Sequence, residues 1–273
     1  MVPTQDPPTG SAPPLLPDAA RVAVGWAGGM GVLLGVLFGG PAVAARTGLD
    51  TAAALALVSL LLPAAMVAYV VLLCTVVDRR PAAQLGLRPR GRDAVRGLAA
   101  LCGVALAVVA VTAGCLVTGH ARWLGWQGLA AGAAAAWLGL LPAVCAQAFP
   151  EEVLFRGYLY RTVAHRRTAA VAAGNAGLFG LIHLLSRSDA SGGAERAGYV
   201  VMAAALGWLL VALRVRTGTV WAAIGGHTGH HLATRAAFEL LAPTSTLPWL
   251  LGATVVYAGV GTALLAPRLR APA

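Results

Sequence analysis

Charged residues are scarce in this chain of 273 residues: they make up 11% of it, and lysine does not occur at all. A soluble globular domain carries about 25% charged residues, so an ordinary soluble surface is excluded. Hydrophobic residues account for 58% of the sequence, and the mean hydropathy is +0.75. We therefore expect most of the chain to lie in a lipid bilayer.

Several motifs of soluble enzymes and of disulfide-rich proteins are also missing. The sequence contains no phosphate-binding loop, no HExxH metal motif and no CxxC pair. The four cysteines, Cys74, Cys102, Cys115 and Cys145, fall in apolar stretches, which favours a role as small hydrophobic residues over disulfides. The formal net charge of +10 comes from arginine. In a membrane setting this charge indicates topology, and we expect no nucleic acid partner.

Residues 1–20 are rich in proline and lack the basic start and apolar core of a secretory signal peptide. They predict a disordered cytosolic tail, followed by a membrane domain over residues 21–270. Eight apolar runs follow the tail, and a spanning helix needs roughly 20 such residues. The runs cover about 22–44, 51–77, 95–118, 127–149, 169–186, 198–213, 219–241 and 248–266. The sequence thus predicts an all-α polytopic membrane protein with about eight transmembrane helices in a bundle.

The arginines predict the orientation of these helices, because arginine gathers in cytosolic loops. With a cytosolic N-terminus and one crossing per run, the cytosolic segments hold 15 arginines and the outer loops hold 4. The outer set is Arg46, Arg122, Arg187 and Arg196, while Arg235 lies within a run. We expect a multi-pass protein of the plasma membrane with both termini in the cytosol.

The stretch "FPEEVLFR" places Glu151, Glu152 and Arg156 beside an apolar run. Ionisable groups at membrane depth are costly and suggest a functional site. Proline is typical of the first turn of a helix, so we expect a break at Phe149–Pro150 and a new helix from there. Residues four apart share a helix face, so Glu152 should pair with Arg156 and leave Glu151 pointing elsewhere. An ordinary interfacial helix start would account for the same residues.

Three histidines fall inside later runs: His183 in the fifth, and His227 and His231 in the seventh. His227 and His231 share a helix face, so they can bind a metal or direct two N–H donors to one point. A polar seam between packed helices is the other interpretation, and His230 is turned away from this face. A carboxylate beside a histidine can deprotonate water, and further donors can stabilise an oxyanion. Together with Glu151, these histidines predict a hydrolytic site among the fourth, fifth and seventh helices.

These residues resemble the CPBP family of intramembrane proteases, which includes the CAAX proteases and the bacteriocin-processing enzymes. Three family motifs occur in order: EExxxR at Glu151–Arg156, FxxxH at Phe179–His183 and HxxxN at His227–His231. At the last position this chain has histidine, whereas the family usually has asparagine. The resemblance covers about residues 140–240. It implies an eight-helix bundle that hydrolyses peptide bonds within or beside the membrane.

The resemblance also implies roles for individual residues. The expected catalytic residues are Glu151, His183, His227 and His231, and the expected supporting residues are Glu152, Arg156 and Phe179. Glu151 would act as general base with His183 as its partner on the attacking water, and His227 would help to stabilise the oxyanion. A zinc ion held by His183, His227, His231 and Glu151 and a metal-free mechanism both stay open.

The sequence therefore predicts an intramembrane endopeptidase of the CPBP type, metal-dependent or not. Its partners would be the bilayer and a peptide or membrane-protein substrate. A non-catalytic scaffold or immunity protein of the same fold is the alternative hypothesis. A transporter with a broken helix at Phe149–Pro150 is a third, although no matching broken segment occurs in the other half of the chain.

Overall fold

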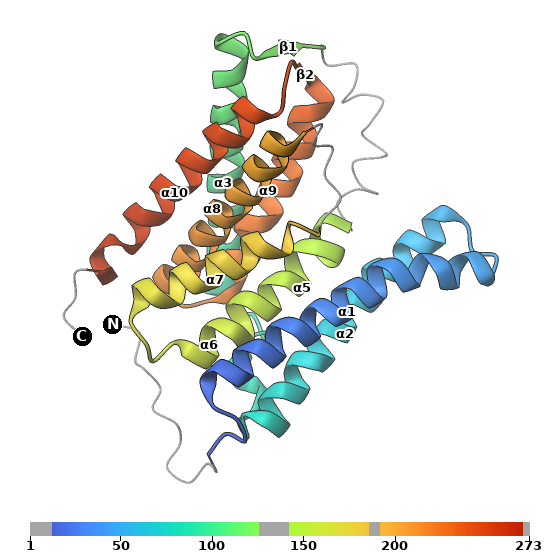
Figure 1. Ribbon diagram of the computed structural model, residues 1–273, viewed down its shortest axis with the longest axis vertical. Coiled ribbons are helices and arrows are strands. Elements are labelled where there is room, and N and C mark those ends of the chain that lie inside the picture. The colour runs from blue at the N-terminus through green and yellow to red at the C-terminus, as the bar shows by residue number, and fades with distance from the viewer. Residues whose placement is uncertain (1–12, 126–141, 186–191, 270–273) are drawn as a thin grey trace.

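The computed structural model describes residues 13–125, 142–185 and 192–269. Its main helices coincide with the predicted apolar runs. They are α1 (Asp18–Arg46), α2 (Thr51–Leu72), α3 (Gly91–Val117), α7 (Thr168–Ile182), α8 (Gly193–Thr217), α9 (Val220–Leu240) and α10 (Leu247–Leu269) (Figure 1). Of the fourth predicted run, the part before Pro142 lies outside the described residues. α1 includes the last three residues of the segment expected to be a tail.

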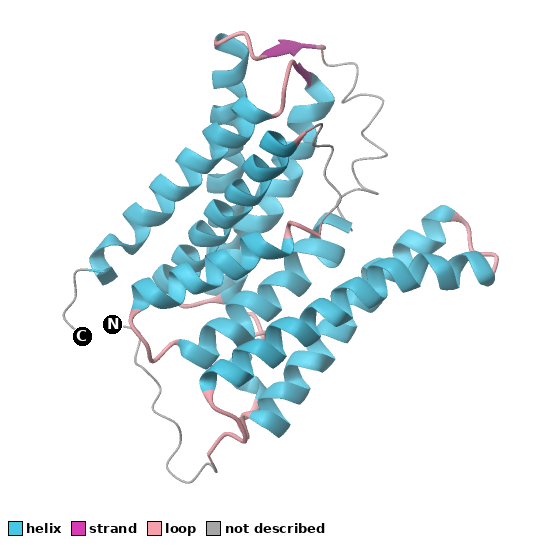
Figure 2. Cartoon of the chain, in the orientation of Figure 1, coloured by secondary structure: helices cyan, strands magenta, loops and turns pink. Residues whose placement is uncertain are grey.

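Five segments of the described chain are long and apolar enough to cross a membrane. They are Asp18–Arg46, Thr51–Val77, Gly91–Val117, Gly193–Thr217 and Leu247–Leu269. α7 is apolar but shorter, and α9 is the helix that carries the histidine pair. Together with the dominance of helix in Figure 2, these spans confirm an all-α polytopic membrane protein.

The helices form two groups with a central helical stretch between them. α1 and α2 make a long antiparallel hairpin at one side (Figure 1), while α3, α8, α9 and α10 pack together and α7 packs on α8. One buried apolar cluster joins the second group, and another joins α1, α2 and α7 to the central stretch. The short strands β1 (Ala121–Trp123) and β2 (Leu241–Pro243) pair antiparallel beyond the ends of α3 and α9.

The central stretch does not break at Phe149–Pro150, so that prediction was wrong. Four helical segments follow one another without a gap: η3 (Pro142–Ala148), α5 (Phe149–Glu152), η4 (Val153–Leu159) and α6 (Tyr160–Val163). Proline lacks an N–H, and its ring crowds the carbonyl one turn earlier. η3 and η4 are π-helical, and their wider turns take up the proline within the helix. The transporter hypothesis rested on the break and loses its basis.

Glycine sets the distance between α9 and α3. A Cβ atom on Gly225 would lie 2.0 Å from the carbonyl oxygen of Gly97, and one on Gly229 would lie 2.3 Å from that of Leu101. Small residues allow membrane helices to approach this closely. The contact fixes the depth and rotation of α9, and therefore the position of its histidines.

Candidate active site

A cavity of about 770 Å³ lies between the α1–α2 hairpin and the helices that carry the polar motifs. All four predicted catalytic residues line it: Glu151 from α5, His183 at the end of α7, and His227 and His231 from α9. The hairpin contributes apolar side chains, among them Leu37. The fold thus brings three motifs, far apart in sequence, to one place.

Glu152 is fully buried and joins two of the motifs. Its Oε1 accepts a hydrogen bond from Nη1 of Arg156 at 2.9 Å and another from Nδ1 of His227 at 2.9 Å. The predicted Glu152–Arg156 pair is therefore present. The contact with His227 was not predicted, and it ties the helix of the first motif to α9.

Arg156 is held from three sides. In addition to its bond with Glu152, its Nη2 donates to the carbonyl oxygen of Gly207 on α8 at 2.7 Å. Its guanidinium lies 4.6 Å from the ring centroid of Phe179 on α7. A fully buried charge needs this kind of pairing, because an uncompensated one is strongly destabilising. Arg156 therefore acts as a rigid connection between η4, α7 and α8.

Phe179, the first residue of the FxxxH motif, stands at the centre of these groups. Its ring centroid lies 4.8 Å from that of His183 and 5.6 Å from that of His227. It is fully buried and packs against Arg156 as well. The side chain fills the space that the polar groups would otherwise share, and it holds both imidazole rings in place.

The hydrogen bonds assign the protons on the α9 histidines. A carboxylate oxygen only accepts, so Nδ1 of His227 donates to Glu152. Nε2 of a neutral His227 is then an acceptor, and it lies 3.0 Å from Nε2 of His231. His231 must therefore donate from Nε2. The result is a hydrogen-bond chain from His231 through His227 to Glu152, which in turn is bound by Arg156.

His183 is oriented by its own helix. Its Nδ1 lies 2.8 Å from the carbonyl oxygen of Phe179, and because a carbonyl only accepts, Nδ1 carries the proton. Nε2 is then the acceptor nitrogen of the ring. The ring also packs against Tyr199 of α8, with centroids 5.5 Å apart. His183 is thereby fixed as a hydrogen-bond acceptor at the cavity wall.

Glu151 differs from Glu152 in its surroundings, as the helical geometry predicted. It lines the cavity, and its Oε2 is buried without a hydrogen-bond partner among the described residues. A buried carboxylate oxygen of this kind has room to accept a hydrogen bond from a water molecule in a polar cavity. Of the two adjacent glutamates, one is committed to Arg156 and the other faces the cavity.

A zinc site needs three or four nitrogen, sulfur or oxygen donors around one point. Within residues 13–125, 142–185 and 192–269, no three histidine, cysteine, aspartate or glutamate side chains are arranged to hold a metal. His227 uses one ring nitrogen for Glu152 and the other for His231, so both are already engaged in hydrogen bonds. The residues present do not fit the expected zinc site.

Comparison with protein families adds a second line of support. Residues 132–233 match the family described as type II CAAX prenyl endopeptidase Rce1-like. This segment is an Rce1-like domain of the CPBP family. The match spans all three motifs and agrees with the resemblance expected for about residues 140–240. Over these residues the chain is similar to a CAAX protease family, and the five apolar spans described above make it a membrane protein. No curated protein and no solved structure matched the chain.

The site and its surroundings contain residues that the sequence analysis did not assign to it. Tyr199 and Arg235 both line the cavity, and Asn175 is buried and donates to the carbonyl oxygen of Phe155 at 2.8 Å. For Arg235 a signal was available, because it follows His231 by four residues on the same helix face. His230 points away from the cavity and bonds the hydroxyl of Tyr257 at 2.8 Å.

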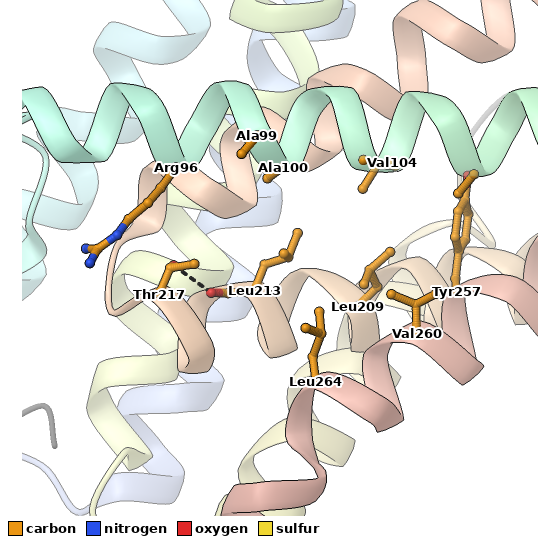
Figure 3. A pocket seen from close by; sticks show the side chains of 12 residues that line it. Arg96, Ala99, Ala100, Val104, Leu209, Leu213, Thr217, Tyr257, Val260 and Leu264 are labelled. Atoms are coloured by element: carbon orange, nitrogen blue, oxygen red, sulfur yellow. Dashed lines mark hydrogen bonds between the residues drawn. The ribbon is translucent and has the colours of Figure 1, made fainter.

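A second cavity of about 320 Å³ lies between α3, α8 and α10. Figure 3 shows its wall of aliphatic side chains, with Arg96 at one end and Tyr257 at the other. None of the predicted catalytic residues lines it. The predicted catalytic residues therefore lie at the larger of these two cavities and not at the smaller one.

Proposed function

We propose that the chain is an intramembrane endopeptidase that hydrolyses a peptide bond with a water molecule activated by Glu151 and His183. The substrate would be a peptide or a membrane-associated protein. The observation that carries this proposal is the convergence of Glu151, His183, His227 and His231 on one cavity. The similarity of residues 132–233 to the type II CAAX prenyl endopeptidase Rce1-like family also supports it.

The proposed reaction begins with the water molecule. Glu151 accepts one of its protons, and Nε2 of His183 accepts a hydrogen bond from the other and orients the molecule. The water oxygen attacks the carbonyl carbon of the peptide bond, and the carbonyl oxygen becomes an oxyanion. Glu151 then delivers its proton to the peptide nitrogen as the carbon–nitrogen bond breaks. The products are a carboxylic acid and an amine, and no metal takes part in any step.

The donor to the oxyanion is His231 rather than His227. Because Nδ1 of His227 bonds Glu152, its Nε2 is an acceptor and a neutral ring has no second proton to donate. In the structure the single N–H of a neutral His231 donates to Nε2 of His227, and in the proposed reaction this proton would turn from His227 to the oxyanion. An N–H donor beside the reacting carbonyl stabilises the developing charge. His231 would thus supply the kind of donor that asparagine supplies in relatives, with His227 as its positioning residue.

A non-catalytic scaffold or immunity protein remains the alternative. In that case the Glu152–Arg156 pair and the histidine chain would only fix helix packing. The location in the plasma membrane and the cytosolic termini also stay predictions. The arginine distribution supports them.

The test compares the wild type with a Glu151→Ala/His183→Ala double variant in proteoliposomes. The probe is a pool of quenched fluorescent peptides of mixed sequence, with cut positions read by mass spectrometry. We expect the wild type to cut peptides that the double variant leaves intact, although both unfold at similar temperatures. Equal signals from the two proteins would reject the protease and favour the scaffold.

A further inference from the structure

Arg235 lies on the same face of α9 as the two catalytic-motif histidines. His227, His231 and Arg235 follow one another at intervals of four residues, and all three line the 770 Å³ cavity. Successive members of such a series are about one helical turn apart. Arg235 is an exposed residue, so it stands where the cavity meets the surface.

The charge of Arg235 is not matched within the described part of the chain. Two buried arginines of the bundle are paired: Arg156 with Glu152, and Arg21 with Asp78. For Arg235, the described residues provide neither an ion pair nor a hydrogen bond. An arginine within a membrane helix is costly without a partner, and by default it indicates a functional site.

Much of the cavity lining is apolar. The α1–α2 hairpin contributes aliphatic and aromatic side chains to it, among them Leu34, Leu37 and Phe38. Glu151 is the anionic residue of the described lining, and in the proposed reaction it activates the water molecule. A peptide that enters this cavity therefore meets one strong cationic group, and a guanidinium binds carboxylates through two parallel hydrogen bonds.

We propose that Arg235 is a specificity-determining residue that binds a carboxylate of the peptide substrate. This proposal rests on the proposed function. The carboxylate is either the free C-terminus or the side chain of an aspartate or glutamate. An extended peptide advances about 3.3 Å per residue, and one helical turn rises about 5.4 Å. With the reach of the arginine side chain added, the carboxylate lies about two to four residues from the bond that is cut.

The experiment measures kcat and KM for matched quenched peptides in proteoliposomes. One arm compares a free C-terminal carboxylate with the C-terminal amide. The other uses amidated peptides and compares glutamate with glutamine two, three and four residues from the cut bond. Each peptide is tested on the wild type and on Arg235→Gln. Arg46→Gln is the matched control, because Arg46 is exposed at the end of α1 and does not line the cavity.

We expect the carboxylate to lower KM about tenfold in one arm for the wild type and for Arg46→Gln. Arg235→Gln should lose this preference and keep its kcat on the neutral peptides. Arg235→Glu should prefer a peptide with lysine at the carboxylate position. This reversal of preference would not occur if Arg235 were merely structural or interfacial. The responding arm identifies the source of the carboxylate.

Two results would overturn the inference in distinguishable ways. Cleavage of all peptides with no carboxylate preference, or an equal preference in Arg235→Gln, would overturn the role of Arg235 and leave the protease intact. Wild-type protein that cuts no peptide of either arm would overturn the protease together with this inference.

Discussion

Nδ1 of His227 lies 2.9 Å from Oε1 of Glu152, so the first and third motifs share one buried carboxylate. Because of this contact, the two glutamates of the EExxxR motif have different roles. Glu152 binds Arg156 and sets the proton position on His227, which in turn makes His231 a donor. Glu151 is left facing the cavity. A structural carboxylate and a reactive one thus stand at adjacent positions of one helix.

The Glu152→Gln substitution should destabilise the protein and remove most of its activity. The change leaves Arg156 as a buried charge without a counter-charge, and breaking such a pair costs about 3–5 kcal/mol. It also replaces one of the two carboxylate oxygens by an amide NH₂, which donates and cannot accept. Unfolding in detergent micelles, followed by tryptophan fluorescence, measures the effect. Glu239→Gln is the control, since Glu239 is exposed on α9 and outside the cavity lining. Equal unfolding midpoints for the two variants would disprove the role of Glu152.

The His231→Asn substitution should retain activity, whereas His231→Leu should lose it. Asparagine keeps an N–H donor at this position, and leucine has a similar size without one. Removal of one oxyanion donor lowers kcat by about 10²–10³ in well-studied hydrolases. Initial rates and KM values on one peptide substrate separate the two variants. Similar rates for asparagine and leucine would show that no donor is needed at residue 231.

The Gly229→Ala substitution should destabilise the bundle because α9 cannot keep its distance from α3. The added Cβ would lie 2.3 Å from the backbone oxygen of Leu101, and overpacking of this kind costs about 1–3 kcal/mol. Gly114→Ala is the matched control on α3, where nothing lies within 4 Å of the added atom. Thermal unfolding should show a loss for Gly229→Ala alone, and activity should fall with it as the histidines shift. A Gly229→Ala protein with wild-type stability would contradict the close packing.

Treatment with a strong chelator should leave peptide cleavage unchanged. Both ring nitrogens of His227 are already used by Glu152 and His231, so the donor set does not form a metal site. The purified protein should accordingly contain zinc far below one ion per chain, as measured by plasma mass spectrometry. Activity lost on chelation and restored by zinc, together with stoichiometric zinc that disappears in His227→Ala, would refute the metal-free reaction.

Local helix geometry and composition predicted the membrane fold and part of the candidate site. The all-α membrane architecture followed from the apolar runs, and the Glu152–Arg156 pair followed from residues four apart on a helix. The bond from His227 to Glu152 joins residues 75 positions apart, and no local pattern predicts which face of α9 meets the central helix. The predicted break at Phe149–Pro150 failed for another reason: π-helical turns absorb a proline, and their position depends on packing.

The most direct measurement of how this site works compares two variants, Glu151→Gln and Glu239→Gln, in proteoliposomes prepared in parallel. The quantity compared is the initial rate of peptide cleavage. Both substitutions remove one carboxylate, but only Glu151 lines the cavity. General-base catalysis contributes about 10²–10⁴-fold, so we expect Glu151→Gln to be at least about a hundredfold slower at unchanged unfolding temperature. Equal rates for the two variants would contradict a reaction in which Glu151 activates the water.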